Sequence, residues 1–389
     1  MSILVTGGTG FLGKAILTRL VDMPRFERIY LLVRPKQAQS AEQRVTAIIG
    51  RMFPAHKAAA LKARIHTLSG QLESPGLGLS PADMVIVRRE VRQILHIGAS
   101  TDFGAPLAES RLSNVEGTRH VLDLAVDLKV SGEFVRFDYV STAYVAGRTP
   151  GIVTEGDLDR GQTFANNYEQ SKFEAEVLVR EHCRELPITI YRPSIIVGDS
   201  RHGFTPHFKV LYWPLLVLSK DLLRFFACNM NALLDVVPVD FVADSIVALM
   251  LRETSVGQTF HLTAGKGNEI KIRQLLTDAY SVAKIRRRPS VPFWAFYLVW
   301  KTWLRRLVAE SFWEIVELAR PYFCYLQGTG VRFDATATDE TLGPLGIHAP
   351  LWENYKHAIL NYCLTSRWGR KPSKPEFMYY LTGAQEDFA

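Results

Sequence analysis

The chain begins MSILVTGGTGFLG (residues 1–13), an apolar run that leads directly into a turn with four glycines. Glycine favours neither helix nor strand, but it allows positive φ angles and lets a ligand approach the backbone closely. Residues 15–21 (AILTRLV) then show the apolar spacing of a helix. A strand, a glycine turn and a helix N-terminus in this order form a binding site for a pyrophosphate, which accepts hydrogen bonds from backbone N–H groups.

The spacing of these glycines is G-x-x-G-x-x-G. Such a triplet also occurs in strand-to-helix turns that bind nothing, but its place directly after the first strand favours a dinucleotide cofactor. The residues of the turn that we expect to contact the cofactor are Gly7, Thr9, Gly10, Phe11, Leu12 and Gly13.

Beyond the turn, short apolar runs alternate with amphipathic segments up to about residue 200. This alternation is typical of a parallel sheet with helices on both faces, and it predicts a Rossmann-type, doubly wound α/β fold. Within it we expect a dinucleotide-binding domain at 1–270, with a substrate-side insertion at about 200–235, and a smaller, mostly helical substrate-binding region at 271–389. The predicted strands are 3–6, 29–33, 65–69, 93–97, 136–141 and 188–192, and the predicted helices are 10–22, 113–128 and 168–185.

The composition is that of a globular protein with 389 residues and a net charge of +7. The charge fits an anionic cofactor, a membrane surface or an unspecialised basic surface better than nucleic acid, because no long Lys/Arg block is present. The four cysteines are far apart and show no metal-ligand spacing, so we expect a reducing compartment and no metal. No basic leader precedes the first strand, and no apolar run reaches the roughly 20 residues that span a bilayer. We therefore expect a cytoplasmic protein.

The residues after the second predicted strand bear on the choice of cofactor. In a dinucleotide-binding fold, an acidic residue there binds the ribose 2′-hydroxyl of NAD, whereas arginine accommodates the 2′-phosphate of NADP. Residues 33–36 read VRPK, and a further arginine follows at position 44. The alternative is a solvated basic loop. Since no acidic residue is present, we expect NADPH, with Arg34 and Arg44 at its 2′-phosphate.

Residues 168–172 (YEQSK) carry the strongest indication of catalysis. Their spacing places Tyr168 and Lys172 on one face of the predicted helix. Tyrosine has an ordinary pKa near 10, and a nearby ammonium lowers it by favouring the phenolate. Thr142 ends a predicted strand and offers a hydroxyl to a substrate oxygen. Y-x-x-x-K alone is more often a surface pair, but after the glycine turn and the strand-end hydroxyl it predicts a catalytic set of Thr142, Tyr168 and Lys172.

Over roughly residues 1–270 the chain resembles the extended short-chain dehydrogenase/reductases. The stretches that carry this resemblance are TGGTGFLG, ILHIGAST, SNVEGTRHVLDLA, YVSTAYVAG, NNYEQSK, YRPSIIVGDS and VVPVDFVADSIV. Within that superfamily the chain is most similar to the fatty acyl-CoA reductase and thioester reductase group. That similarity rests on LLVRPK, SGQLESPGLGLS, VSTAYVAG and the aromatic insertion that leads into LLDVVPVD.

The resemblance implies the same catalytic set of Thr142, Tyr168 and Lys172, with Ser141 as a neighbour able to take the place of Thr142. Tyr168 and Lys172 then also contact the cofactor. At one position the chain departs from the family, because Gln71 stands where an aspartate often meets the adenine. The other cofactor-binding residues implied by the resemblance are Gly98, Ala99 and Ser100 along the middle of the cofactor, Asn114 in a structural role, and Pro193 and Ser194 near the nicotinamide.

The activity implied by the resemblance is the NADPH-dependent reduction of a long-chain acyl thioester, carried by coenzyme A or a carrier protein. Hydride passes from NADPH to the carbonyl, Tyr168 donates the proton, and Lys172 bonds the nicotinamide ribose. The hemithioacetal collapses to aldehyde and thiol, and a second reduction gives the alcohol. One alternative is a dehydrogenase or reductase of a sterol, isoprenoid or nucleotide sugar. Another is a non-enzymatic NADP-binding scaffold, which the retained tyrosine and lysine disfavour.

The last third of the chain is rich in aromatic residues. Residues 291–308 (VPFWAFYLVWKTWLRRLV) predict an amphipathic helix. It either contacts a membrane or an acyl chain, or packs as a core helix. From residue 321 onward we expect a cap segment and a final helix that close the substrate side. His202, His207 and His348 are interpreted as ordinary loop histidines, and a homodimer through the helices that flank Tyr168 is expected only by analogy with related folds.

Overall fold

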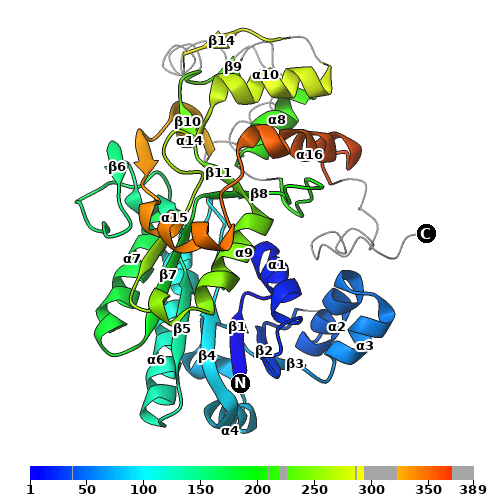
Figure 1. The fold of residues 1–389 in the computed structure, drawn as a ribbon, viewed down its shortest axis with the longest axis vertical. Coiled ribbons are helices and arrows are strands. Elements are labelled where there is room, and N and C mark those ends of the chain that lie inside the picture. The colour runs from blue at the N-terminus through cyan, green and yellow to red at the C-terminus, as the bar shows by residue number, and fades with distance from the viewer. Residues whose placement is uncertain (37, 209, 220–225, 285–286, 293–321, 370–389) are drawn as a thin grey trace.

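A seven-stranded parallel sheet forms the centre of the computed structural model (Figure 1). The structure describes all residues except 37, 209, 220–225, 285–286, 293–321 and 370–389, so almost all of the amphipathic segment expected at 291–308 lies outside the described residues. In spatial order the strands are β12 (Thr259–Leu262), β7 (Ile188–Pro193), β5 (Arg136–Val140), β4 (Val91–His96), β1 (Ser2–Thr6), β2 (Arg28–Val33) and β3 (Ile65–Ser69).

The strand order confirms the predicted doubly wound fold. The chain passes outward from β1 to β2 and β3, returns to β4 on the other side of β1, and continues outward through β5, β7 and β12. The order therefore reverses between β1 and β4, and ligands of open parallel sheets bind at such a switch point, beyond the carboxyl ends of the strands. All six predicted strands are present, and β12 was missed.

Apolar side chains alternate between the two faces of the sheet, so each face can bury a layer of helices. On β1, Ile3 and Val5 belong to one core cluster and Leu4 belongs to the cluster on the other face. The first cluster includes side chains of α1 (Phe11–Leu20), α2 (Ala41–Met52) and α9 (Val239–Met250). The second includes side chains of α4 (Pro81–Glu90), α6 (Gly117–Val130) and α7 (Asn167–Glu181).

The predicted helices agree with the structure except near their ends. The segment predicted as one helix at 113–128 begins with a π-helical turn at Leu112–Glu116 and continues as α6. The segment predicted at 168–185 is α7 followed by a short 3₁₀ turn, His182–Arg184. Two shorter helices, α3 (Ala55–Leu61) and α5 (Leu107–Arg111), complete this part of the chain.

A second body of structure covers the carboxyl ends of the strands, at the top of Figure 1. It has its own core cluster, to which residues from 143–153, 197–236 and 270–363 contribute. Three strand pairs hold it together: β8 (Ile195–Val197) with β11 (Val236–Pro238), β10 (Leu233–Leu234) with β13 (Ile270–Lys271), and β9 (Phe226–Ala227) with β14 (Ser290–Val291). Its helices are α8 (Tyr212–Ser219), α10 (Ile272–Ala283), α14 (Phe323–Gln327) and α16 (Trp352–Thr365).

The C-terminal segment is held beside the main sheet by a separate two-stranded sheet and by one buried carboxylate, which also bonds the backbone N–H of His261 on β12. β15 (Val331–Phe333) runs parallel to β6 (Gly151–Val153), and α15 (Thr336–Leu342) follows it. Glu155 then accepts hydrogen bonds from the backbone N–H groups of Ala337 and Thr338 and from the Thr338 hydroxyl. These contacts fix residues 331–342 beside the carboxyl ends of the strands.

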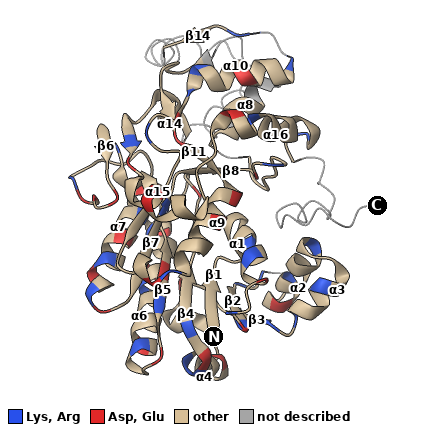
Figure 2. Cartoon of the chain, viewed as in Figure 1, with Lys and Arg blue, Asp and Glu red and all other residues tan. Residues whose placement is uncertain are grey.

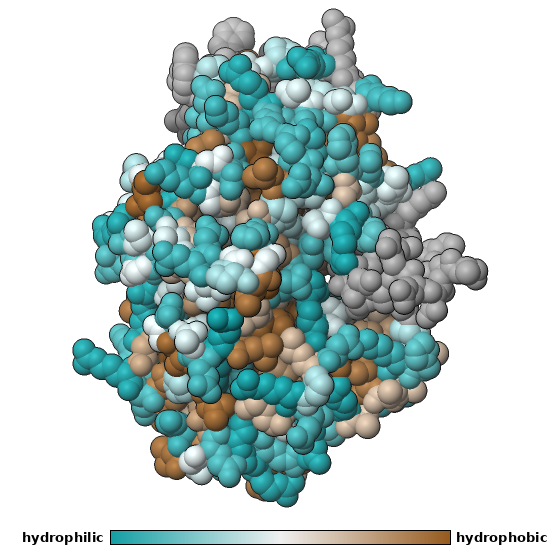
Figure 3. All heavy atoms as spheres, viewed as in Figure 1, coloured by the Kyte–Doolittle hydropathy of each residue, from teal (hydrophilic) through white to brown (hydrophobic). Residues whose placement is uncertain are grey.

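The face of the molecule drawn in Figures 2 and 3 shows neither a single-sign region of charge nor one continuous apolar region. Both signs of charge are spread over the outer helices (Figure 2). The face drawn in Figure 3 is mainly hydrophilic, with hydrophobic residues gathered in small groups. Within the part of the chain that the structure describes, no helix has the length and apolar character needed to cross a bilayer.

The backbone of the glycine turn is tightly packed. Gly7 has φ = 70°, a conformation that L side chains rarely adopt. A Cβ atom at Gly7 would lie 2.6 Å from the backbone nitrogen of Gly98, and one at Gly13 would lie 2.2 Å from the carbonyl oxygen of Gly7. Both glycines are therefore required by backbone packing between β1, α1 and the residues after β4.

We predict that Gly13→Ala lowers the free energy of unfolding by about 2–3 kcal/mol, because the new methyl group must displace backbone atoms. The matched control is Gly50→Ala in α2, where nothing lies within 4 Å of the position that the added methyl group would take. That control should raise the free energy of unfolding by about 0.5–1 kcal/mol, since alanine favours helix. Urea denaturation monitored by circular dichroism measures both, and equal effects of the two substitutions would contradict the account.

Candidate functional site

A cavity of about 650 Å³ opens at the switch point of the sheet, beyond the carboxyl ends of its strands. It extends from the glycine turn, past the ends of β4 and β5, to the aromatic residues of the second body. The predicted site residues that line it are Gly7, Thr9, Gly10, Phe11, Leu12, Gly13, Arg34, Arg44, Gly98, Ala99, Ser100, Thr142, Tyr168, Lys172, Pro193 and Ser194. Of the predicted set, Asn114 alone is not in the wall.

Asn114 lies behind the cavity wall and makes hydrogen bonds to a residue that lines it. Its side-chain oxygen accepts a hydrogen bond of 2.7 Å from the backbone N–H of Ser100, and its amide donates to the Ser171 hydroxyl at 2.8 Å. It is almost fully buried. Asn114 therefore fixes the Gly98–Ser100 segment against α7, which agrees with the structural role implied by the resemblance.

The glycine turn fits a pyrophosphate. A Cβ atom at Gly10 would meet only the carbonyl oxygen of Gly7, at 3.1 Å, so its other side is open to the cavity that Gly10 lines. A side chain there would fill the space in which a ligand can approach the backbone. Gly10 is also the N-cap of α1. A phosphate at this point would meet the N-terminus of that helix, where backbone N–H groups are left without partners in the helix.

The adenosine end of the cavity contains the two predicted arginines. Arg34 follows β2 directly and is 62% exposed, and the Arg44 guanidinium donates to its carbonyl oxygen. The Arg34 guanidinium also lies 3.9 Å from the carboxylate of Glu73, which accepts a hydrogen bond from the Ser113 hydroxyl. Glu73 was not predicted, and it partly neutralises Arg34. Gln71 also lines this end.

Thr142, Tyr168 and Lys172 meet at the centre of the cavity. Thr142 follows β5, and its hydroxyl donates to the carbonyl oxygen of Pro193 at 3.3 Å and makes a hydrogen bond with Tyr168. Tyr168 lies in the first turn of α7, and Lys172 lies one turn later on the same face. The helix thus presents the phenol and the amine to the same cavity that Thr142 lines.

The expectation that the Lys172 ammonium lowers the pKa of Tyr168 is wrong for this structure. Burial raises the pKa of Tyr168 to about 12, and the interaction with the Thr142 hydroxyl offsets only part of that rise. The ammonium itself is directed elsewhere, to Tyr139 at 2.8 Å and to the carbonyl oxygen of Val140 at 2.9 Å. Tyr168 is therefore a neutral phenol at physiological pH.

The amine of Lys172 has an unusual pKa. Burial lowers it to about 7, and the carboxylate of Glu176, one helical turn further along α7, opposes that effect. Glu176 was missed in the sequence, although its spacing of four residues from Lys172 was visible there. Lys172 is only 2% exposed, so water screens its interactions with neighbouring charges little.

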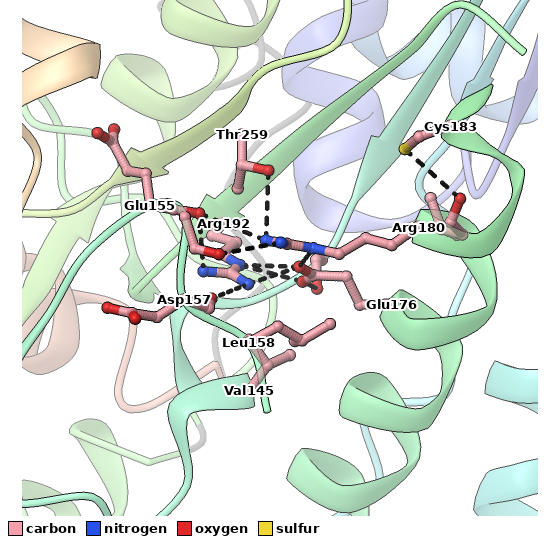
Figure 4. Close-up of polar contacts among 12 residues, drawn as sticks. Val145, Glu155, Asp157, Leu158, Glu176, Arg180, Cys183, Arg192 and Thr259 are labelled. Atoms are coloured by element: carbon pink, nitrogen blue, oxygen red, sulfur yellow. Dashed lines mark hydrogen bonds and ion pairs between the residues drawn. The ribbon is translucent and has the colours of Figure 1, made fainter. Parts of the chain in front are cut away.

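Glu176 is the centre of a buried polar network (Figure 4). It accepts hydrogen bonds of 2.6 Å from the Ser141 hydroxyl and from the Arg192 guanidinium, and Arg180 approaches it at 3.2 Å. Burial alone would raise the pKa of Glu176, but these partners, Arg192 foremost, hold it below its ordinary value. Because the Ser141 hydroxyl is committed to this network, it does not take the place of Thr142.

The substrate end of the cavity is aromatic. The Phe103 ring stacks on Tyr168, with ring centroids 5.0 Å apart, and the Tyr325 ring of α14 lies 6.1 Å from Phe103 and 5.3 Å from Tyr144. Tyr325 donates to the buried carboxylate of Glu169 at 2.7 Å, which fixes α14 over the site. Tyr325, from the segment in which a cap was expected, therefore lines this end of the cavity.

Several residues of this end could not be found by motif. His207, interpreted from the sequence as an ordinary loop residue, lines the cavity. The insertion at about 200–235 and the aromatic last third indicated only the general position of Thr205, Val210, Tyr212 and Tyr325, and no motif indicated a substrate-side role for the others. The further lining residues on this side are Phe103, Tyr144, Ile195, Ile196, Thr205, Val210, Tyr212 and Tyr325.

Comparisons with known proteins agree with this architecture. A family model, NAD_binding_4, described as "Male sterility protein", matches residues 5–246. The chain is similar to the terminal R domain from the myxalamid PKS-NRPS biosynthetic pathway, with a TM-score of 0.79 and 30% identity over 96% of this chain and 92% of that one.

Among curated proteins, the chain is 26% identical to "Fatty acyl-CoA reductase wat" of Drosophila melanogaster, over 77% of this chain and 65% of that protein. It is also 26% identical to "Fatty acyl-CoA reductase 1" of Rattus norvegicus, over 78% of this chain and 66% of that protein. The chain thus spans less than two thirds of the length of these fatty acyl-CoA reductases.

The family match covers the end of β1, all of β2, β3, β4, β5 and β7, the glycine turn and the helix that carries Tyr168 and Lys172. The similarity to the myxalamid R domain extends over the second body as well. The chain therefore belongs to the family described as "Male sterility protein", within the fatty acyl-CoA reductase and thioester reductase group of the extended short-chain dehydrogenase/reductases.

Proposed function

We propose that this protein reduces the thioester carbonyl of a long-chain acyl group with NADPH, and that Tyr168 donates the proton. The observation that carries the proposal is that a phenol, a hydroxyl and an amine, Tyr168, Thr142 and Lys172, line one cavity together with the glycine turn and an aromatic pocket. In this proposal, the end of the cavity at the glycine turn binds the dinucleotide, and the aromatic end binds the apolar chain.

Each residue of the catalytic set has a distinct task in this proposal. Because the pKa of Tyr168 is raised to about 12, its phenol keeps its proton at neutral pH and can give it to an oxygen on which negative charge develops. Thr142 donates a second hydrogen bond to that oxygen, and Lys172 orients the nicotinamide ribose. NADPH, when bound, supplies the hydride.

The choice of NADPH rests on the adenosine end of the cavity. Arg34 and Arg44 offer two guanidinium groups next to β2, where an acidic residue would be expected for NAD. Glu73 lies near Arg34 but remains on the loop after β3, so the guanidinium has N–H groups left to bind a 2′-phosphate bidentately.

The substrate side supports an apolar acyl chain. Phe103, Tyr144 and Tyr325 present ring faces and edges to the cavity, whereas a nucleotide sugar would require cationic and polar groups there. A sterol or isoprenoid alcohol or ketone would fit the same rings and is the alternative. The thioester would arrive on coenzyme A or a carrier protein, with residues 1–270 binding the cofactor and residues 271–389 closing the acyl side.

We predict that Tyr168→Phe lowers kcat for thioester reduction roughly 100-fold or more, because the proton donor is lost, while the NADPH Kd changes little. The matched control is Tyr30→Phe, whose hydroxyl bonds Glu90 at the edge of the sheet, away from the cavity. Stopped-flow NADPH oxidation and fluorescence titration measure the two quantities. Full turnover in Tyr168→Phe would rule out this role.

Arg34→Ala should weaken NADPH binding about tenfold and leave NADH binding nearly unchanged, because only NADPH has the 2′-phosphate. Arg88→Ala, on exposed α4, controls for the loss of a positive charge. Calorimetric titration of both cofactors into both variants provides the measurement. An equal loss for NADH and NADPH, or tighter binding of NADH by the unmodified protein, would exclude the assignment.

The substrate class is tested by NADPH oxidation with long-chain acyl-CoA, acyl-pantetheine, sterol and nucleotide-sugar substrates, followed by product analysis. We expect turnover with the acyl thioesters and release of free thiol in a one-to-one ratio with the aldehyde. An alcohol product would show that a second reduction takes place. Activity confined to sterols would favour the alternative.

A further inference from the structure

The amine of Lys172 contacts Tyr139, a tyrosine that is not part of the predicted catalytic set. Tyr139 lies on β5, three residues before Thr142, and is fully buried. Its hydroxyl oxygen is 2.8 Å from Lys172 Nζ, and Nζ also lies 4.4 Å from the centre of its ring. The carbonyl oxygen of Val140 is the second acceptor, at 2.9 Å.

These two acceptors leave a defined direction for the third donor of the ammonium. A lysine ammonium has three N–H groups. Two of them are taken by Tyr139 and Val140, and Lys172 lines the cavity, so the remaining N–H is available to a group bound there. Tyr139 thus helps to set both the position and the orientation of the Lys172 ammonium group.

The orientation of the Tyr139 hydroxyl is itself determined by its neighbours. Thr118 donates its single O–H to the carbonyl oxygen of Asn114, at 2.6 Å. The Thr118 oxygen is therefore an acceptor for its other two partners, Tyr139 and Nε2 of His96, the latter at 3.0 Å. Because the Lys172 ammonium carries only donors, the Tyr139 oxygen accepts from it, and the Tyr139 proton points away from Lys172.

The series of hydrogen bonds that begins at Lys172 and Tyr139 continues from His96 to Thr6 and Gly98, next to the glycine turn. With its proton on Nε2, His96 accepts at Nδ1 from the Thr6 hydroxyl, at 2.6 Å, and the Thr6 oxygen accepts from the backbone N–H of Gly98. Burial, aided by the charge of Lys172, lowers the pKa of His96 to about 3, so the ring stays neutral. Each side chain in this series therefore has a fixed role as hydrogen-bond donor or acceptor at each contact.

We propose that Tyr139 is a positioning residue for Lys172, which holds the ammonium at the cavity and keeps it protonated. The inference rests on the proposed function, because it assigns Lys172 to the cofactor and catalytic site. Among the residues that the structure describes, few charged or titratable groups face Lys172. They are Tyr139 on β5, His96 on β4, and Tyr168 and Glu176 on α7, with Arg192 of β7 behind Glu176.

The charge of Lys172 sets the expected pH dependence. Burial lowers its pKa to about 7, so the ammonium is present below that pH and is lost as the pH rises through it. An acceptor that bonds the charged form opposes this effect of burial. Removing the Tyr139 hydroxyl must therefore lower the pKa further, and the alkaline loss of cofactor binding must move to lower pH.

The test compares NADPH affinity across pH 5 to 9 for the unmodified protein and for Tyr139→Phe, by energy transfer from protein tryptophan to NADPH. We expect the midpoint of the alkaline loss of affinity to move down by about one pH unit in the variant, with affinities that converge at low pH. Profiles with the same midpoint, whether or not affinity falls uniformly, would overturn the proposal.

Two further comparisons separate positioning from stability. Tyr191→Phe removes a buried hydroxyl that bonds Asp138 at 2.6 Å on the opposite face of the sheet, so it should lower Tm without moving the midpoint. Thr118→Val should move the midpoint in the same direction as Tyr139→Phe, and Thr118→Ser should restore it. A midpoint moved equally by Tyr191→Phe would overturn the proposal.

The binding measurement also separates this inference from the proposed function. If the unmodified protein binds NADPH but reduces no thioester, the proposed substrate is wrong, and the shift in Tyr139→Phe remains interpretable. If thioester reduction is observed, the decrease of its kcat/KM at alkaline pH should also occur at a lower pH in Tyr139→Phe than in the unmodified protein.

Discussion

The close approach of two backbone segments at the switch point is the constraint on which the rest of the site depends. Gly7 follows β1 and Gly98 follows β4, and their backbones come so close that a single added carbon atom at Gly7 would clash. The contact lies where the carboxyl ends of β1 and β4 are adjacent. From this point the remaining strands lie on opposite sides, β2 and β3 beyond β1 and β5, β7 and β12 beyond β4. The cavity, the start of α1 and the hydrogen bond from Gly98 to Thr6 all follow from it.

A buried charged group links the strand ends around Tyr168 and Lys172. Glu176 contacts Ser141 at the end of β5 and Arg192 near the end of β7, and both residues immediately precede site residues. A buried ion pair contributes little net stability, because desolvation offsets the attraction, but losing one partner leaves an uncompensated charge. Such a pair therefore tolerates little movement of the strand ends, which suits a site that must align a phenol with a hydroxyl.

Much of the fold and part of the site could be predicted from the sequence, because they depend on local spacing. The six strands, the glycine turn and the Tyr168–Lys172 pair all follow from periodicity and short motifs. Tyr139 and Phe103 could not be found in this way, since their importance comes from contacts across the fold. The pKa of Tyr168 was mispredicted for the same reason: spacing brings a lysine near, but only the three-dimensional structure shows that the ammonium turns to β5.

The contact between Glu155 and residues 337–338 has a consequence for the order in which the protein can be completed. The partners are 183 residues apart in the chain, and all strands of the main sheet precede residue 263. A chain that emerges from the ribosome N-terminus first can therefore assemble the main sheet, in which the backbone N–H of His261 already bonds Glu155, while the rest of that carboxylate is still hydrated. Only when residues 337–338 arrive does the carboxylate exchange the remaining water for the N–H groups of Ala337 and Thr338.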